Sequence, residues 1–272
     1  MARTGLQRSN FNTRTSNEIA AMVGKISGIT RVHKFGTSSA IGTNLTPVAQ
    51  GNVYQTPTVP VQIKAVSDAA TDTAAGTGAQ QIAVQGLDAN WDEQTVFIEM
   101  NGLTDSATTT ETFIRVYRAW VSRSGVYATV AVPSQDGIIN ILAADDTLYM
   151  VISVEPKVVT TVDYGVGQSE CAAFTIPRKK QGVLLGYDIW INSGKVVDVL
   201  FTARMDANIV TPPYSGCMRV ASRLVGLIND VSVHPVYPIA YYPPMTDMAV
   251  LAKGASSPAV ACDFQLVLID TP

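Results

Sequence analysis

The clearest pattern in the chain is the alternation of apolar and polar side chains over residues 80–88 and again over residues 93–100. A period of two residues is typical of β-strands with one buried face. Four residues suited to a turn separate the two segments, and Asn101-Gly102, a strong turn signal, follows the second. The pattern therefore predicts a β-hairpin. The residues expected on its buried face are Ile82, Val84, Val96, Ile98 and Met100.

The same alternation continues through the rest of the chain and predicts an all-β fold. Strands in the first half are expected at 59–66, 80–88, 93–100, 112–121, 126–132, 138–142 and 147–154. Strands in the second half are expected at 158–162, 170–176, 183–191, 195–205, 217–225, 231–236, 247–253 and 259–269. Turn signals spaced about 8–12 residues apart are typical of β-sandwiches and jelly rolls. We therefore expect two successive antiparallel β-sandwich domains, jelly-roll-like in character.

The link between two of these strands has a turn signal of its own. Asn192-Ser193-Gly194 stands between the strands at 183–191 and 195–205. Short loops of Asn and Gly favour hairpins. We therefore expect these two strands to pair.

Residues 16–28 show a different period, which is typical of a helix. Apolar side chains recur there at i, i+3, i+4 and i+7, Ser16 or Asn17 can cap the start, and Gly28 can end it. We expect one short amphipathic helix, which needs a partner surface because about three turns are marginal in isolation. The expected domains are a basic arm with this helix at 1–36, a first sandwich at 37–156 and a second at 157–272.

Charge is low overall and unevenly distributed. Charged residues make up 15% of the chain, against about 25% in an ordinary soluble domain. Residues 1–36 hold six Lys or Arg against Glu18 alone, and the remaining residues carry 13 basic and 21 acidic side chains. This asymmetry predicts a basic arm on an acidic body. The arm residues expected to bind a partner are Arg3, Arg8, Arg14, Ile19, Met22, Val23 and Ile26.

Targeting signals and cysteines limit where the chain works. The first residues lack the apolar run of about 7–15 residues that a secretion signal needs, and no segment approaches the roughly 18 apolar residues of a membrane span. We expect a protein that stays in the cytoplasm in which it is made, with no membrane contact. Cys171, Cys217 and Cys262 are far apart in apolar segments, which favours buried free thiols over a disulfide or a metal site.

Candidate chemistry is sparse. His33 and His234 lie in different halves with no metal-binding spacing, so we expect no metal, no cofactor and no catalytic residues. Four aspartates in turns could touch calcium at a loop but lack an EF-hand pattern, and solvated turn carboxylates are the preferred interpretation. These are Asp68, Asp72, Asp145 and Asp146.

Two segments of the chain are candidate binding surfaces. Arg178-Lys179-Lys180 has no interleaved aromatic residues and is interpreted as a solvated turn, so no nucleic-acid partner is expected. Residues 237–244, YPIAYYPP, could form a sugar platform, but a packed loop or a protein contact is favoured. The candidate interface residues there are Tyr237, Tyr241 and Tyr242.

Several strings of the chain resemble a family of virion structural proteins of tailed bacteriophages, abundant among marine and cyanobacterial phages. The strings are RVHKFG, AAGTGAQQIAVQGLDANWDEQTVFIEMNG, FIRVYRAWV and FTIPRKKQGVLLGYDIWINSGKVVDVLF, and the resemblance covers roughly residues 31–272. It rests on strand and turn pattern and not on catalytic motifs. The resemblance implies a place in a particle instead of a reaction.

Residue pattern and resemblance both favour a non-enzymatic assembly protein located in the virion. The expected role is a capsid cement or decoration protein that binds and stabilises the shell of the major capsid protein. A tail component such as a fibre, baseplate or neck protein is the alternative, and a carbohydrate-binding module is a remoter one. We also expect self-association, most simply as a cyclic homotrimer.

Overall fold

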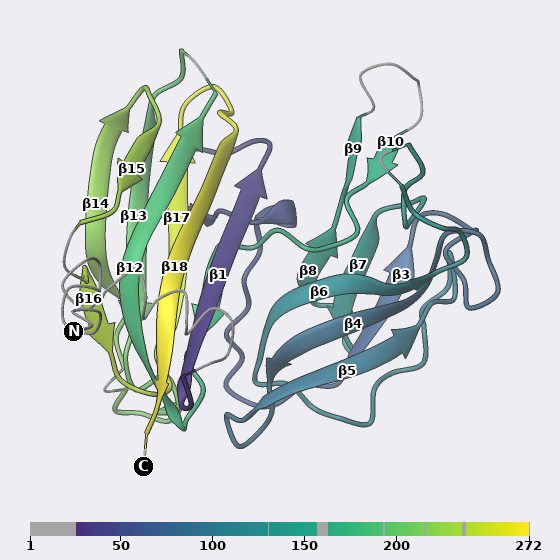
Figure 1. The fold of residues 1–272 in the computed structure, drawn as a ribbon, viewed down its shortest axis with the longest axis horizontal. Helices are drawn as coiled ribbons and strands as arrows, with labels where there is room; N and C mark the ends of the chain where they lie inside the picture. The colour runs from purple at the N-terminus through teal and green to yellow at the C-terminus, as the bar shows by residue number, and fades with distance from the viewer. Residues whose placement is uncertain are drawn as a thin grey trace, which may run out of the picture.

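The computed structural model describes residues 26–129, 131–156, 163–192, 194–214, 216–235 and 238–271. The described chain is built from antiparallel β-sheets in two lobes (Figure 1), which confirms the all-β prediction. It contains no α-helix, and one short 3-10 turn lies at Gln50–Asn52. The helix predicted over residues 16–28 and the strand predicted at 158–162 fall largely or wholly outside the described residues.

The C-terminal lobe, on the left of Figure 1, consists of two five-stranded sheets. Phe264 and Leu266 of one sheet and Val199, Phe201 and Val250 of the other belong to one buried apolar cluster, so the two sheets face each other across this core. The first sheet contains β1 (Ile29–Ser38), β18 (Val260–Asp270), β12 (Lys180–Ile191), β15 (Val231–Val233) and β16 (Ala240–Tyr242). The second contains β11 (Ala173–Thr175), β17 (Asp247–Gly254), β13 (Val197–Arg204), β14 (Arg219–Leu227) and β2 (Thr46–Pro47).

The N-terminal lobe consists of two three-stranded sheets around a second apolar cluster that includes Ile82, Ile98, Phe113, Ile141 and Ile152. One sheet contains β3 (Ile63–Ser67), β7 (Ile139–Ala143) and β8 (Leu148–Ile152), and the other contains β5 (Glu93–Glu99), β4 (Ala79–Leu87) and β6 (Arg115–Ser124). The short strands β9 (Val154–Pro156) and β10 (Asp163–Gly165) pair separately.

The hairpin predicted over residues 80–100 is confirmed. Strands β4 and β5 pair from Gln81 opposite Glu99 to Leu87 opposite Glu93. The turn is closed by a hydrogen bond from the Asp88 amide to the Asp92 carbonyl, at 2.9 Å. The alternation also indicates the correct face, because Ile98 and Met100 are buried.

The boundary predicted for the end of the arm, residue 36, lies inside a strand of the C-terminal lobe. Strand β1 is paired along its whole length with β18, from Ile29 opposite Ile269 to Ser38 opposite Val260. Residues 29–36 therefore belong to a sheet of the C-terminal lobe. Lys34, counted above among the basic residues of the arm, is 7% exposed and donates from Nζ to the Tyr117 carbonyl at 2.5 Å. Burial lowers the pKa of Lys34 to about 8.

Gly36 lies where β1 packs closely against the backbone of two neighbouring segments. A Cβ atom at this position would lie 2.2 Å from both the Ala172 nitrogen and the Val48 oxygen, which are backbone atoms that cannot move aside. We expect Gly36→Ala to lower the free energy of unfolding by about 1–3 kcal/mol through overpacking. Gly42→Ala, where a Cβ meets nothing within 4 Å, is the control. Urea unfolding of both variants measures the difference, and equal midpoints would contradict the close approach.

Two strand predictions are wrong. Strands β12 and β13 do not form a hairpin, since β12 pairs with β18 and β13 pairs with β14 and β17 in the opposite sheet. Asn192 instead exchanges hydrogen bonds with Ala259, the residue before the start of β18, which is the strand next to β12. Residues 126–132 form no strand in their described part beyond one isolated bridge between Thr129 and Val132. Alternation identifies buried faces but not partners, and Tyr127 is 91% exposed.

A buried ion-pair cluster joins the two lobes. Arg115 of β6 donates from Nε to Asp247 Oδ1 at 2.7 Å and from Nη2 to Oδ2 at 2.9 Å, and both residues are fully buried. Arg204 contacts the same carboxylate, and Thr175 donates to it at 2.8 Å. The Arg115 guanidinium also lies 4.8 Å from the Trp91 ring centre. Burial alone would raise the pKa of Asp247, but Arg115 and then Arg204 outweigh it and hold the pKa below its usual value.

Asp72 is a structural residue instead of the solvated turn carboxylate predicted. It is fully buried, and its two oxygens accept four hydrogen bonds. The donors are the Ser67 hydroxyl at 2.6 Å and the backbone amides of Ala79 at 2.7 Å, Gly137 at 3.0 Å and Asp136 at 3.1 Å. Through these hydrogen bonds Asp72 connects residues 136–137 to the start of β4. A bound calcium ion is not needed to explain the position of the Asp72 side chain.

Candidate interaction surface

Strand β14 and its flanking residues carry an unusual concentration of exposed apolar side chains. Of the sixteen large apolar side chains that are exposed among the described residues, seven fall within residues 205–228. Single exposed apolar residues are ordinary, but a concentrated set indicates an interaction site. We call this set the β14 surface: Met205 (37%), Ile209 (39%), Tyr214 (57%), Met218 (46%), Val220 (50%), Val225 (66%) and Ile228 (55%).

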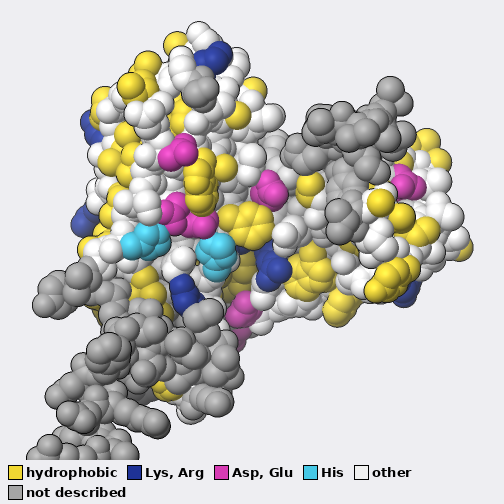
Figure 2. Space-filling model, turned by 45° about the horizontal axis from the view of Figure 1, so that its top comes forward, with side chains coloured by type: hydrophobic (Ala, Val, Ile, Leu, Met, Phe, Trp, Pro, Cys, Tyr) yellow, Lys and Arg dark blue, Asp and Glu magenta, His cyan; other side chains and the backbone are white. Residues whose placement is uncertain are grey.

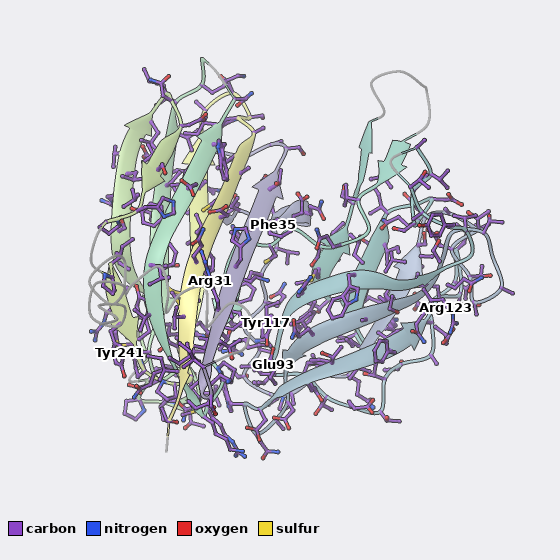
Figure 3. All side chains as sticks on the ribbon, viewed as in Figure 1. Arg31, Phe35, Glu93, Tyr117, Arg123 and Tyr241 are labelled. Atoms are coloured by element: carbon purple, nitrogen blue, oxygen red, sulfur yellow. The ribbon has the colours of Figure 1, made fainter. Side chains whose placement is uncertain are left out.

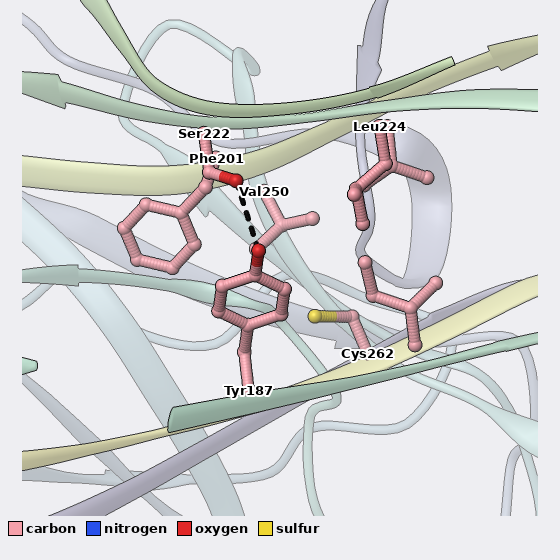
Figure 4. Close-up of a pocket in the computed structure, with 8 residues that line it drawn as sticks. Tyr187, Phe201, Ser222, Leu224, Val250 and Cys262 are labelled. Carbon is pink, nitrogen blue, oxygen red and sulfur yellow. Dashed lines mark hydrogen bonds between the residues drawn. The ribbon is translucent and has the colours of Figure 1, made fainter. Parts of the chain in front are cut away.

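The other side of β14 holds the strand in place. Ser222 Oγ lies 2.8 Å from the Tyr187 hydroxyl of the opposite sheet, and Leu224 packs against the apolar core (Figure 4). The space between them is a cavity of about 10 Å³, lined also by Phe201 and Cys262, which is about the size of one water molecule. The position of β14 is therefore fixed by its inner side chains, while its outer apolar side chains have no such partners within the described chain.

Strand β14 is also a sheet edge. It pairs with β13 alone, with two irregularities in register. Its exposed residues include Arg219 and Arg223, and charged side chains on an edge oppose indiscriminate strand pairing. The β14 surface is therefore suited to side-chain packing against a partner more than to extension of the sheet.

The predicted interface tyrosines differ in their exposure to solvent. Tyr241 is 54% exposed on β16, opposite Val183 of β12 (Figure 3), so this part of the predicted loop is a strand. Tyr242 is 3% exposed and belongs to the apolar core, and burial raises its pKa. Its place in the core makes Tyr242 a packing residue instead of an interface residue. Tyr237 lies outside the described residues.

Most of the predicted arm residues also lie outside the described residues. This applies to Arg3, Arg8, Arg14, Ile19, Met22 and Val23. Ile26 is described, is partly buried, and accepts a hydrogen bond at its carbonyl from the Ile29 amide at 3.4 Å. The partner-binding role of the arm stays a prediction.

The two histidines, far apart in sequence, meet on the outer face of the first sheet of the C-terminal lobe. His33 Nε2 lies 3.0 Å from Asp263 Oδ2, and His234 Nε2 lies 2.8 Å from Asp188 Oδ2. The two aspartates are opposite each other on β12 and β18, so carboxylates lie between the imidazoles (Figure 2). Burial alone would raise the pKa of Asp188, but hydrogen bonds from Ser232 and His234 lower it.

This histidine–aspartate row ties four segments of the sheet together. Like charges directly opposite on neighbouring strands are unfavourable, and each of these two carboxylates has an imidazole nitrogen within hydrogen-bond distance. No signal in the sequence could have predicted the row, because it depends on β1 pairing with β18. Within the described parts of the chain, no three His, Cys, Asp or Glu side chains are arranged as metal ligands.

The structure also places the three cysteines and the basic turn at residues 178–180. Cys171 and Cys262 are buried free thiols as predicted, but Cys217, next to the β14 surface, is exposed. Arg178 forms a two-point contact with Asp92 at 2.9 and 2.7 Å, so the basic turn is partly neutralised. Among the described residues, no helix has the length and apolar character to cross a membrane.

Comparisons with known proteins give little further guidance. No protein-family model matches the chain, and no curated protein matches it. A chain in the structure of infectious bursal disease virus Gt strain aligns over 90% of this chain and 78% of its own length, with 10% identity and a TM-score of 0.19. A TM-score this low carries no argument about fold or function.

Proposed function

We propose that the protein is a non-enzymatic structural component of the virion of a tailed bacteriophage. In this role it is a capsid cement or decoration protein, which binds the major capsid protein and stabilises the shell. The observation that carries the proposal is the β14 surface, a set of seven exposed apolar side chains within residues 205–228. The strand and turn resemblance over residues 31–272 supports the same role.

The architecture is compatible with such a role. We propose that each lobe is a β-sandwich of jelly-roll type, since in each lobe side chains from two antiparallel sheets share one apolar cluster. The buried contact of Arg115 with Asp247 joins the two lobes directly. A two-lobed body joined by buried contacts can bridge neighbouring shell subunits.

Binding to the particle tests the proposal. We expect Val225→Asp to lower the affinity for particles stripped of this protein by about tenfold or more, because a central apolar contact would be replaced by a charge. Val59→Asp is the matched control, since Val59 is 64% exposed on the other lobe and Val225 is 66% exposed. Sedimentation of the particles with bound protein measures the affinity.

Two outcomes would contradict the proposal. Equal loss of binding in both variants would show that Val225 has no special role. A copy number of a few to tens per particle, in place of hundreds, would assign the protein to the tail instead of the shell.

A further inference from the structure

Strand β5 has a free edge that is open to a partner. It is the outermost strand of its sheet and pairs with β4 alone. The Met100 amide bonds toward Gln80 of β4, so by the alternation of an antiparallel ladder the even positions face β4 and the odd positions face outward. The outward positions are Glu93, Thr95, Phe97 and Glu99. No backbone hydrogen bond joins them to another described residue on that side.

A groove of about 540 Å³ runs along this edge. One wall is β5, and the other is the segment 106–111. That segment is held away from β5 by hydrogen bonds to β3, from the Ser106 amide to the Ala65 carbonyl and from the Thr109 amide to the Ile63 carbonyl, both at 2.8 Å. The edge of β5 is therefore not covered by the chain beside it.

We infer that β5 pairs with β5 of a second copy of this chain, antiparallel, around a twofold axis at Phe97. In this register each outward residue meets a compatible one: Phe97 lies opposite the partner's Phe97, and Glu99 lies opposite the partner's Thr95. Thr95, Phe97 and Glu99 each belong to a pair that exchanges two backbone hydrogen bonds, and Glu93 lies beyond them, opposite the partner's Asn101. The two three-stranded sheets become one continuous sheet across the dimer.

The side chains of β5 favour a second copy over an unrelated strand. Phe97 is 59% exposed on the outer face, and two such rings beside a twofold axis form an aromatic cross-strand pair. No like charges stand directly opposite, and Glu99 is already contacted by Arg123 of β6. Strand β14 is a poorer candidate, because two register irregularities interrupt its pairing with β13, whereas β5 pairs with β4 without an irregularity.

This contact deepens the proposed structural role by naming one mode of self-association. It differs from the threefold contact expected from the sequence, and a particle can contain both. It is tested with purified protein in solution, so its failure leaves the particle-binding test of the β14 surface unaffected.

Replacing Phe97, at the proposed twofold axis, with residues of opposite charge gives the most direct test. We expect the wild-type chain to form dimers by sedimentation equilibrium. Phe97→Lys and Phe97→Glu should each weaken dimerisation at least tenfold, because like charges then face each other at the axis. An equimolar mixture of the two variants should regain the dimer, since Lys then faces Glu. Val59→Lys is the control, because Val59 is 64% exposed and lies outside both β5 and the β14 surface, and it should dimerise as the wild type does.

Cross-linking tests the register independently of charge. In a Cys217→Ser background, which removes the exposed thiol, Phe97→Cys should form an interchain disulfide on mild oxidation, because antiparallel partners lie about 5.5 Å apart. Thr95→Cys in the same background should not, since residue 95 lies opposite the partner's residue 99. A monomeric wild-type chain, a mixture that stays monomeric, or equal cross-linking at both positions would overturn the inference.

Discussion

Replacing Asp247 with alanine is expected to lower the free energy of unfolding by about 3–5 kcal/mol, since it leaves the buried Arg115 guanidinium without its carboxylate. Arg115 is fully buried and forms a two-point contact with Asp247 across the lobe junction. A buried cation without a partner loses its hydration and gains nothing in return. Urea unfolding followed by circular dichroism measures the change.

The double variant Arg115→Met with Asp247→Leu separates the two parts of this cost. Removing both charges avoids the unpaired cation, so the double variant should be less destabilised than Asp247→Ala. Arg123→Ala is the surface control, because Arg123 and Glu99 are both about half exposed and such pairs contribute up to about 1 kcal/mol. Equal destabilisation by Arg123→Ala and Asp247→Ala would contradict the interpretation of the cluster.

The carboxylate of Asp247 should make the free energy of unfolding depend on pH. The pKa of Asp247 is lower in the folded state than its ordinary value. A lowered carboxyl pKa adds stability that is complete above the unfolded pKa of about 3.9 and is lost as pH falls through the folded pKa. Wild-type stability should therefore decline more steeply below pH of about 4 than that of the double variant.

The second large effect is expected at Asp72. Asp72→Ala removes the acceptor for the Ser67 hydroxyl and for three backbone amides, all at a fully buried position. Buried donors without acceptors cost about 1–3 kcal/mol each, partly relieved when water enters, so a total of about 3–5 kcal/mol is expected. Thermal unfolding measures it as a fall in midpoint temperature.

A neighbouring aspartate serves as the control for this prediction. Asp68 is exposed and accepts one backbone hydrogen bond, from the Ile138 amide at 2.7 Å. Asp68→Ala should therefore cost about 1 kcal/mol. If the two variants unfold at the same temperature, the four-bond arrangement around Asp72 is not the source of its stabilising effect.

Much of the strand pattern could be predicted because it depends on local alternation. The hairpin of β4 and β5 has both its strands and its turn in one short segment, so pattern and pairing agree. Strands β17 and β18 were also predicted within a few residues, at 247–253 and 259–269. A buried face is a property of one strand, and its side chains reveal it.

Pairing across long separations could not be predicted in the same way. The loop signal at residues 192–194 suggested a hairpin, but β12 and β13 lie in opposite sheets because β18 pairs with β12 instead. The histidine–aspartate row and the contact of Arg115 with Asp247 depend on the same long-range choices. Burial of Tyr242 was missed because its strand is only three residues long.

The pairing of β1 with β18 has a consequence for how the chain is made. Strand β1 pairs with residues 260–269, so the nascent strand has no pairing partner while all the residues between them are being translated. Non-local pairing is slow, and an unpaired strand is prone to aggregation in the meantime. Prematurely ended chains that lack β18 should therefore collect in the insoluble fraction of the expressing cell, and chains that include β18 should stay in the soluble fraction.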